Sequence, residues 1–230
     1  MRRTAPSLIL ASVLALGSVA SCGAPDPGSE TTAPAEAPAS APAQMTFSAE
    51  QLNQLAPAEA RVISNPADPQ ATLILFTDYQ CPYCAMMDTL IQQAKEDYGD
   101  SVRIVVRNYP LPNHRNAEPA ARAVEAAAEQ GALEEMAAKV FEHQQDWKSA
   151  SEVDGIFASY AEELNLDMDR FRADYDSEAV KDRVARDLQD AQELQIRHTP
   201  TLILNDREIQ LQTGAYSEIS EPLDQALANN

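Results

Sequence analysis

Residues 71–84 read Ala-Thr-Leu-Ile-Leu-Phe-Thr-Asp-Tyr-Gln-Cys-Pro-Tyr-Cys, and this stretch decides the fold. The first six residues form a short apolar run, which is typical of a buried strand. A helical pattern begins at the two cysteines, and Pro82 suits the first position of that helix. The sequence therefore predicts that Cys81 and Cys84 lie where a helix starts after a strand.

The rest of the chain continues as alternating strands and helices. We expect a strand over 102–107, helices from 117 to about 194 with breaks near 131, 148–151 and 165, a hairpin of 201–204 and 208–211 around 205–207, and a helix from 217. A small sheet flanked by helices is the economical packing for this order. The long helical block is expected to cover one face of the sheet.

Two cysteines separated by two residues have three interpretations. A zinc half-site is one, although zinc usually takes four N or S ligands, there is no second Cys pair, and His114, His143 and His198 are scattered. A structural disulfide is another, although so short a loop would stabilise the fold little. The third is a redox pair, which the position at a helix start favours.

The helix start supplies the physical reason. Unsatisfied backbone N–H groups and the positive end of the helix dipole both favour a thiolate over a thiol. The pKa of Cys81 should therefore be lowered, and a stabilised thiolate is a good leaving group. Cys81 is the predicted nucleophile, and Cys84, one turn further along, is the predicted resolving thiol.

Three segments, in this order, resemble DsbA-like thioredoxin-fold proteins: Phe76-Thr-Asp-Tyr-Gln-Cys-Pro-Tyr-Cys84, Arg107-Asn-Tyr-Pro-Leu-Pro-Asn-His114, and Thr199-Pro200-Thr201-Leu202. The resemblance covers residues 60–229. It implies an α/β thioredoxin fold with a helical insertion at about 115–190. It also implies a cis peptide at Thr199-Pro200 beside the redox pair, where a substrate strand can pair.

The sequence departs from this family at two positions. Related proteins usually carry an acidic residue six positions before the first cysteine, and here that residue is Leu75, with Asp78 nearer but in the loop. The residue before the Thr-Pro pair is commonly glycine, and here it is His198. A protonated histidine beside a thiolate would lower the thiol pKa further, so we count His198 among the tuning and substrate-binding residues with Pro82, Tyr83, Thr199 and Pro200.

The resemblance implies a thiol:disulfide oxidoreductase of the cell envelope that introduces disulfides into exported proteins through a Cys81 mixed disulfide resolved by Cys84. It implies no cofactor beyond this disulfide, no metal, and a membrane redox partner of the DsbB or VKOR type. The likeness to DsbA, together with the export signal that residues 1–21 resemble, favours oxidation. A Pro-Tyr dipeptide also occurs in reducing glutaredoxins, so a reductase or isomerase, and a non-catalytic binding lipoprotein, are alternatives.

The N-terminal residues predict export. Residues 1–21 read as a signal peptide, with Arg2 and Arg3 before an apolar run too short to span a bilayer. The ending Val19-Ala20-Ser21-Cys22 resembles the lipobox of bacterial lipoproteins, which implies lipidation of Cys22. The Pro- and Ala-rich residues 22–45 predict a flexible tether, and 46–230 the single domain. The lipid would hold the protein on the outer face of the cytoplasmic membrane or on the outer membrane.

The charge balance excludes one class of partner. The chain of 230 residues carries 17 Lys+Arg against 36 Asp+Glu, a net charge of −19. So acidic a protein is repelled by the phosphates of nucleic acids, which are therefore excluded as general partners.

Overall fold

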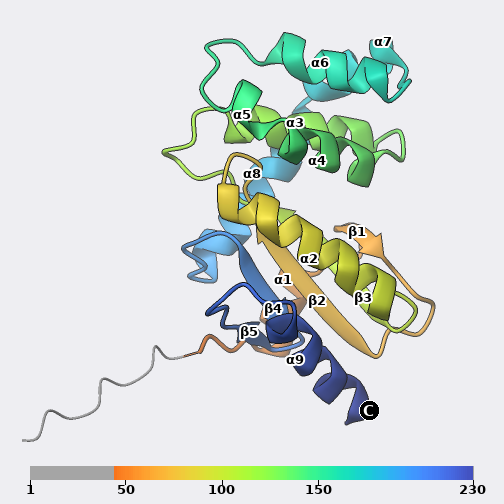
Figure 1. The fold of residues 1–230 in the computed structure, drawn as a ribbon, viewed down its shortest axis with the longest axis vertical. Coiled ribbons are helices and arrows are strands. Elements are labelled where there is room, and N and C mark those ends of the chain that lie inside the picture. The colour runs from red at the N-terminus through yellow and green to blue at the C-terminus, as the bar shows by residue number, and fades with distance from the viewer. Residues whose placement is uncertain (1–43, 230) are drawn as a thin grey trace, which may run out of the picture. The chain divides into compact units, whose positions relative to one another are not determined.

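The computed structural model describes residues 44–229, which lie within one compact unit. Five strands form a sheet in the order β1-β3-β2-β4-β5, with bounds β1 Arg61–Ser64, β2 Ala71–Thr77, β3 Val102–Asn108, β4 Thr201–Leu204 and β5 Arg207–Ile209 (Figure 1). The central strands β2 and β3 are parallel, and the other neighbours are antiparallel. The parallel pair requires a crossover, which the helix after the two cysteines supplies.

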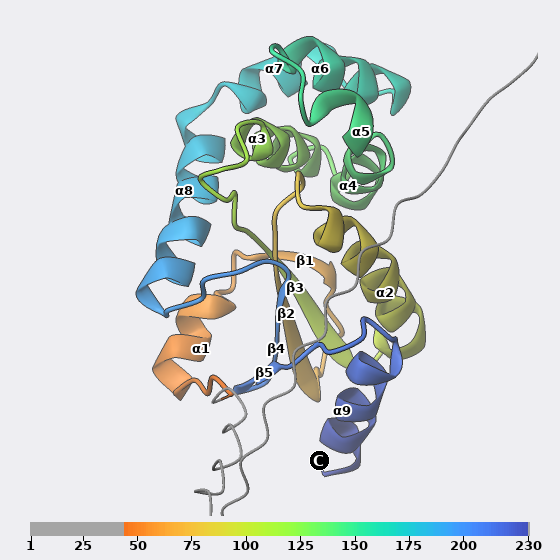
Figure 2. The same ribbon diagram turned by 60° about the vertical axis from the view of Figure 1, so that its left-hand side comes forward.

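Helices lie on both faces of the sheet and beyond one end of it (Figure 2). Their bounds are α1 Ala49–Leu55, α2 Pro82–Tyr98, α3 Ala117–Ala128, α4 Leu133–Glu142, α5 Gln144–Trp147, α6 Asp154–Glu163, α7 Met168–Tyr175, α8 Glu178–Glu193 and α9 Ser217–Ala228. One face carries α1 and α8, and the opposite face carries α2 and α9. Within residues 44–229, no helix is both long and apolar enough to cross a membrane.

The alternation of side chains along β2 creates two of the three cores. Leu73 and Leu75 pack with buried residues of α2 and α9, whereas Ile74 and Phe76 pack with buried residues of α1 and α8. Successive side chains of a strand point to opposite faces, so a strand that is apolar throughout must be covered on both. The apolar run that predicted a buried strand therefore fixes β2 at the centre of the sheet.

The expectation that the helical block covers one face of the sheet is wrong for most of the block. Only α8 packs on a face, while α3 to α7 lie beyond the end of the sheet and build a third core of their own. That core includes Tyr79 and Cys84, so the insertion packs directly against the segment that carries the two cysteines. The predicted breaks near 131 and 165 are confirmed, with φ of 78° at Gly131 and 57° at Asn165.

A buried ion pair joins the helical insertion to the sheet. Arg107 of β3 donates from Nε to Asp187 of α8 over 2.6 Å, and from Nη1 to the carbonyl oxygen of Leu55 over 2.6 Å. Its side chain is only 3% exposed, and a second carboxylate, Asp190, binds Nη2. A buried guanidinium needs several partners to offset its desolvation, and these acceptors fix α1 and α8 against β3.

The N-terminal part of the domain differs from the prediction. The sequence did not predict α1 or β1. The hairpin of β4 and β5, against which this part of the chain lies, is also tighter than expected, because Leu204 already pairs with Arg207 and only Asn205 and Asp206 connect the strands. Gln44 and Met45, at the end of the expected tether, already bond to Glu208 of β5. These contacts, together with the Thr46–Arg207 bridge, cover the outer edge of β5.

Candidate active site

The two cysteines lie at the start of α2, directly beyond the end of β2. Cys81 is the N-cap residue, with extended backbone (φ −77°, ψ 123°), and Pro82 takes the first helical position. Cys84 lies in the first turn. Both are free thiols; Cys81 is 4% exposed and Cys84 is fully buried. Of the two, Cys81 is therefore the one that a partner can reach.

The surroundings of Cys81 favour its thiolate. The S–H group of Cys84 donates to it, and this bond is the largest influence; the backbone N–H groups of Cys84 and Tyr83 also donate, and the nearby Thr199 hydroxyl lowers the pKa to a smaller extent. Burial acts in the opposite direction, because it disfavours charge. Together these influences lower the pKa of Cys81 to about 6. At neutral pH Cys81 is therefore mostly ionised in the reduced protein.

The surroundings of Cys84 have the opposite effect. Burial raises the pKa of Cys84 far above its ordinary value, and the neighbouring Cys81 raises it further. The backbone N–H of Asp78 lies 3.4 Å from its sulfur and offsets a small part of the shift. Two like groups with pKa values moved apart take different roles in a reaction, one as nucleophile or leaving group and one as proton donor.

The bond between Thr199 and Pro200 is cis, which confirms what the resemblance implied. The carbonyl oxygen of Thr199 lies 3.8 Å from the sulfur of Cys81. The Thr199 hydroxyl is buried, and within the described residues it has no hydrogen-bond partner. The hydroxyl is therefore free to donate to a thiolate, and it lowers the pKa of both cysteines.

Polar contacts of buried side chains fix the loop between β2 and α2. The carboxylate of Asp78 accepts from the backbone N–H of Gln80 over 2.7 Å and of Leu111 over 2.8 Å, and lies 2.7 Å from Nδ1 of His114. The segment around His114 was a landmark of the sequence resemblance. The structure gives His114 a positioning role, because it joins the connection after β3 to the loop that presents Cys81.

The helical insertion fixes the same loop from the other side, which the sequence did not reveal. The side-chain amide of Gln144, in α5, donates to the carbonyl oxygens of Tyr79 over 2.8 Å and Cys81 over 3.1 Å. A lone glutamine in a short helix carries no motif. Its role depends on how the insertion folds back onto the redox segment, and local sequence patterns do not encode that.

Leu75 stands where related proteins carry an acidic residue, and an acidic side chain of α2 borders the same small cavity as Leu75. Leu75 is buried in the core, as its side chain requires. Asp88, one turn after Cys84 on α2, borders a cavity of about 20 Å³ that Leu75, Thr77 and Tyr79 also line. Burial raises the pKa of Asp88 to about 6. Its spacing of four residues from Cys84, which places both on one helix face, is the signal that could have identified it.

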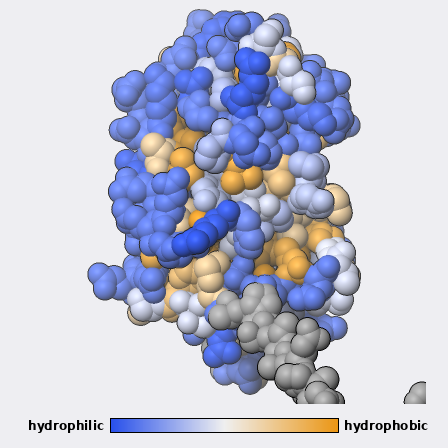
Figure 3. Space-filling view, turned by 90° about the vertical axis from the view of Figure 1, so that its left-hand side faces the viewer, coloured by the Kyte–Doolittle hydropathy of each residue, from blue (hydrophilic) through white to orange (hydrophobic). Residues whose placement is uncertain are grey.

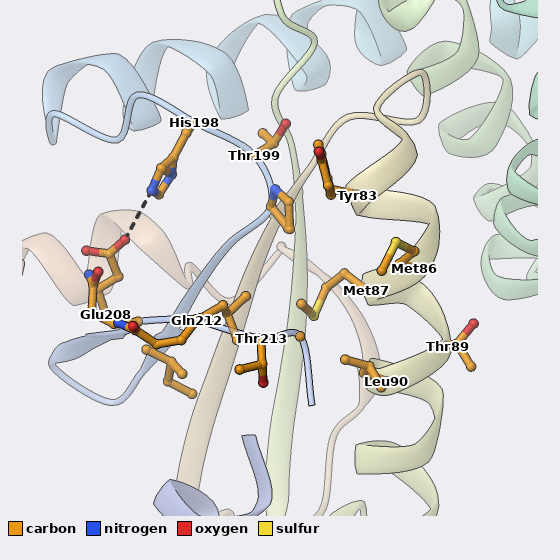
Figure 4. Close-up of a pocket in the computed structure, with 15 residues that line it drawn as sticks. Tyr83, Met86, Met87, Thr89, Leu90, His198, Thr199, Glu208, Gln212 and Thr213 are labelled. Atoms are coloured by element: carbon orange, nitrogen blue, oxygen red, sulfur yellow. Dashed lines mark ion pairs between the residues drawn. The ribbon is translucent and has the colours of Figure 1, made fainter. Parts of the chain in front are cut away.

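The remaining predicted residues surround a groove beside the cysteines (Figure 4). Tyr83 is 67% exposed at its rim. The ring of His198 points toward Glu208, with 3.5 Å between Nε2 and Oε1. Cys22 and the predicted signal peptide lie outside the described residues. Within residues 44–229, no three His, Cys, Asp or Glu side chains gather as metal ligands.

A family model described as thioredoxin matches residues 59–225. The chain belongs to the thioredoxin family. Among curated proteins, a Na⁺/H⁺ antiporter NhaA of Herminiimonas arsenicoxydans is 40% identical over 154 residues, which are 67% of this chain and 23% of the antiporter. A second NhaA, from Salinispora tropica, is 36% identical over 146 residues, 63% of this chain and 22% of that protein. The chain thus spans about a quarter of the length of these relatives.

Solved structures share the fold over most of the chain. Oxidised BdbD from Bacillus subtilis superposes with a TM-score of 0.64 at 23% identity, over 80% of this chain and 97% of BdbD. The thiol-disulfide exchange protein alpha-DsbA2 from Wolbachia pipientis superposes with a TM-score of 0.64 at 15% identity, over 76% of this chain and 91% of that protein. A thioredoxin-like oxidoreductase from Silicibacter pomeroyi superposes with a TM-score of 0.61 at 26% identity, over 76% of this chain and 96% of that protein. The predicted DsbA-like thioredoxin fold with a helical insertion is confirmed.

Proposed function

We propose that this protein is a thiol:disulfide oxidoreductase of the cell envelope that passes its Cys81–Cys84 disulfide to exported proteins. One observation carries the proposal: the pKa of Cys81 is lowered to about 6 while that of its buried neighbour Cys84 is raised. A stabilised thiolate makes the dithiol form more stable, and the disulfide form is then a stronger oxidant. The fold shared with the thioredoxin-like oxidoreductase from Silicibacter pomeroyi supports the same class of reaction.

In the proposed reaction a substrate thiolate attacks the sulfur of Cys81 in the disulfide form. The Cys81–Cys84 bond breaks, Cys84 leaves with the electron pair and takes a proton, and substrate and Cys81 are joined as a mixed disulfide. A second substrate thiolate then attacks the substrate sulfur, and Cys81 leaves as its stabilised thiolate. The substrate has lost two electrons and the protein has gained them. In the reverse direction Cys84 resolves the mixed disulfide, and the substrate leaves reduced.

The reduction potential of the Cys81/Cys84 couple, measured together with turnover of a reduced, unfolded protein, tests the proposal. A potential between about −120 and −180 mV with net oxidation supports it, since known oxidants and isomerases lie there. A potential near about −270 mV with net reduction of disulfides indicates a reductase. Absence of any thiol exchange would leave only a binding module.

We further propose that the protein is lipid-anchored through Cys22 and reoxidised by a membrane protein of the DsbB or VKOR type. The signal-like residues 1–21 and the Pro- and Ala-rich stretch support this location. In a C22A variant the protein should move from the membrane fraction to the soluble fraction with its redox activity intact. Retention of that variant in the membrane would contradict the lipid anchor.

A further inference from the structure

A groove of about 630 Å³ runs beside the cysteine pair, between α2 and the segment that follows β5. Tyr83, Met86, Met87 and Leu90 form the α2 side, and Thr199-Pro200 lies at the end next to Cys81. Tyr83 and Met86 are the only exposed large hydrophobic side chains within residues 44–229. In Figure 3 apolar patches interrupt the middle and lower parts of the face that is drawn, whereas its top is mostly hydrophilic. The groove is therefore suited to an extended peptide with apolar side chains.

One charged group lies in this apolar lining. The side chain of Glu208 is only 6% exposed, and its neighbour His198, which is cationic only when protonated, leaves 3.5 Å between Nε2 and Oε1. Charge-assisted hydrogen bonds are shorter, about 2.7–2.9 Å. A buried carboxylate with so distant a partner is incompletely neutralised, although buried charges normally have close partners.

The partner of Glu208 covers it only loosely. The side chain of His198 is 62% exposed. The ring is held by its other nitrogen, because Nδ1 lies 2.6 Å from the Thr201 hydroxyl, which itself donates to the backbone carbonyl of His198. A change in the side-chain torsions of His198 would open Glu208 to the groove without moving the backbone.

The surrounding charge favours a cationic group at this position. None of the groove's described lining residues is Lys or Arg, and Glu208 is its one acidic residue. The whole chain has a net charge of −19, so its field attracts cationic segments. A lysine or arginine that enters the groove meets a buried carboxylate and no competing basic residue other than His198.

The architecture also limits where a peptide can lie. The outer edge of β5 is occupied, because Glu208 N donates to Met45 O over 3.0 Å and Phe47 N donates to Asp206 O over 2.8 Å. The groove wall over 212–214 is held in place by the carboxylate of Glu218, which accepts from three successive backbone N–H groups. A peptide bound at Cys81 therefore cannot extend the sheet at β5, and the groove, which Glu208 helps to line, is the surface open to it.

We propose that Glu208 and His198 form a subsite for a basic side chain, so that preferred substrates are extended cysteine-containing segments with Lys or Arg near the reacting cysteine. This inference rests on the proposed thiol exchange at Cys81. The basic group replaces the imidazole beside Glu208 and forms the close, charge-assisted bond that His198 does not. Apolar side chains of the same segment pack on Met86 and Leu90.

The test uses single-cysteine peptides and the full, oxidised protein. In one peptide frame, Lys or Gln is placed at each position on either side of the cysteine, and the rate constant of mixed-disulfide formation is measured. An extended chain advances about 3.3 Å per residue, so one or two positions should stand out. There we expect Lys to react about tenfold faster than Gln, as for a favourable buried charge pair.

Three variants locate the preference. E208Q should reduce the Lys/Gln ratio to about one, whereas H198A, which lacks the competing imidazole, should raise it. E142Q removes one exposed charge from α4, far along the chain from the groove, and should keep the wild-type ratio, which separates the subsite from the general acidic field. Circular dichroism shows whether E208Q is folded, and H198A tests the inference independently of E208Q.

The outcomes separate this inference from the proposed function. A flat Lys/Gln scan in the wild type, or an unchanged preference in folded E208Q, overturns the basic subsite while thiol exchange stands. If no peptide of either series forms a mixed disulfide, the proposed function itself fails, and the subsite fails with it. A preference that E142Q abolishes equally is an effect of net charge and also overturns the subsite.

Discussion

The hydrogen bond from Cys84 to Cys81 is the largest influence on the active-site thiolate, so removing it is the sharpest test of the electrostatic argument. The pKa of Cys81 lies at about 6, against an ordinary value of 9.0. These 3 units correspond to about 4 kcal/mol in favour of the thiolate. A hydrogen bond to a charged group contributes about 1.5–3 kcal/mol, which is about 1–2 pKa units. The backbone N–H groups of the helix start also favour the thiolate, and burial opposes all of these donors.

A C84A variant should therefore move the pKa of Cys81 from about 6 to about 7–8. At pH 7 the ionised fraction then falls from about nine-tenths to between half and one-tenth. C84S is the matched control, because its hydroxyl keeps a donor at the same position and should raise the pKa less. Both variants leave Cys81 as the reactive thiol, so titration of thiolate absorbance and the pH profile of its alkylation report on the same group.

Two results would refute this reasoning. If C84A titrates at the same pH as the wild type, the Cys84 donor does not stabilise the thiolate and is not the largest influence on the Cys81 pKa. If C84A titrates near 9, the start of α2 contributes nothing, and the argument from the helix N-terminus fails. Equal pKa values in C84A and C84S would show that cavity size, not the donated hydrogen, controls the shift.

Four further predictions concern the ionisation of Cys81 and Asp88, the buried ion pair of Arg107, and His198. Because the pKa of Cys81 is lowered on folding, ionisation of Cys81 stabilises the reduced fold; the contribution is complete above pH 9 and is lost as the pH falls through 6. Between pH 7 and pH 5 the free energy of unfolding of the reduced protein should therefore fall by about 1.4 kcal/mol relative to that of the oxidised protein, as measured by denaturant titration. For Asp88 the pH dependence of stability has the opposite sign, because its raised pKa lowers the free energy of unfolding as the pH rises from about 4 to about 6. The substitution D88N should therefore stabilise the protein more at pH 7 than at pH 4, by up to about 3 kcal/mol. An equal effect at both pH values would contradict the burial argument. R107M should lower the free energy of unfolding by about 3–5 kcal/mol, since it leaves Asp187 buried without its cation; a loss under 1 kcal/mol would show that the pair is solvated. H198A should leave the Cys81 pKa unchanged, because the ring faces Glu208, and a rise would restore the tuning role that the sequence suggested.

Much of the fold could be read from the sequence because its decisive signals are local. The apolar run of β2, Pro82 at the helix start and the Thr199-Pro200 pair each act through neighbouring residues, and each appears in the structure where the pattern placed it. The structure also bears out the low pKa expected for Cys81 at a helix N-terminus. Here local chemistry and tertiary position agree.

The parts that the sequence missed depend on contacts between distant segments. Strand β1 has only four half-buried residues, and it exists because its partner β3 offers a free edge. Gln144 reaches the redox loop from 63 residues away, and Asp187 reaches Arg107 from 80. A single polar residue in a helix has no periodic signal, so pattern analysis assigns it to the surface. The contact between His198 and Glu208 could not be read from the sequence either, because Glu208 comes from the next strand of the sheet.

The acidity of the chain and the ionised Cys81 oppose each other in principle, yet the local geometry decides the outcome. The domain carries 33 acidic against 15 basic residues, and a negative field raises the pKa of any thiol. At physiological ionic strength, exposed charges more than about 8 Å away are largely screened. The first turn of α2 contains no acid, and the nearby carboxylate of Asp78 is already bound by two backbone N–H groups and His114. The donors in direct contact with the Cys81 sulfur therefore outweigh the net charge, and the acidity is left to act over longer distances, on the approach of cationic segments to the groove.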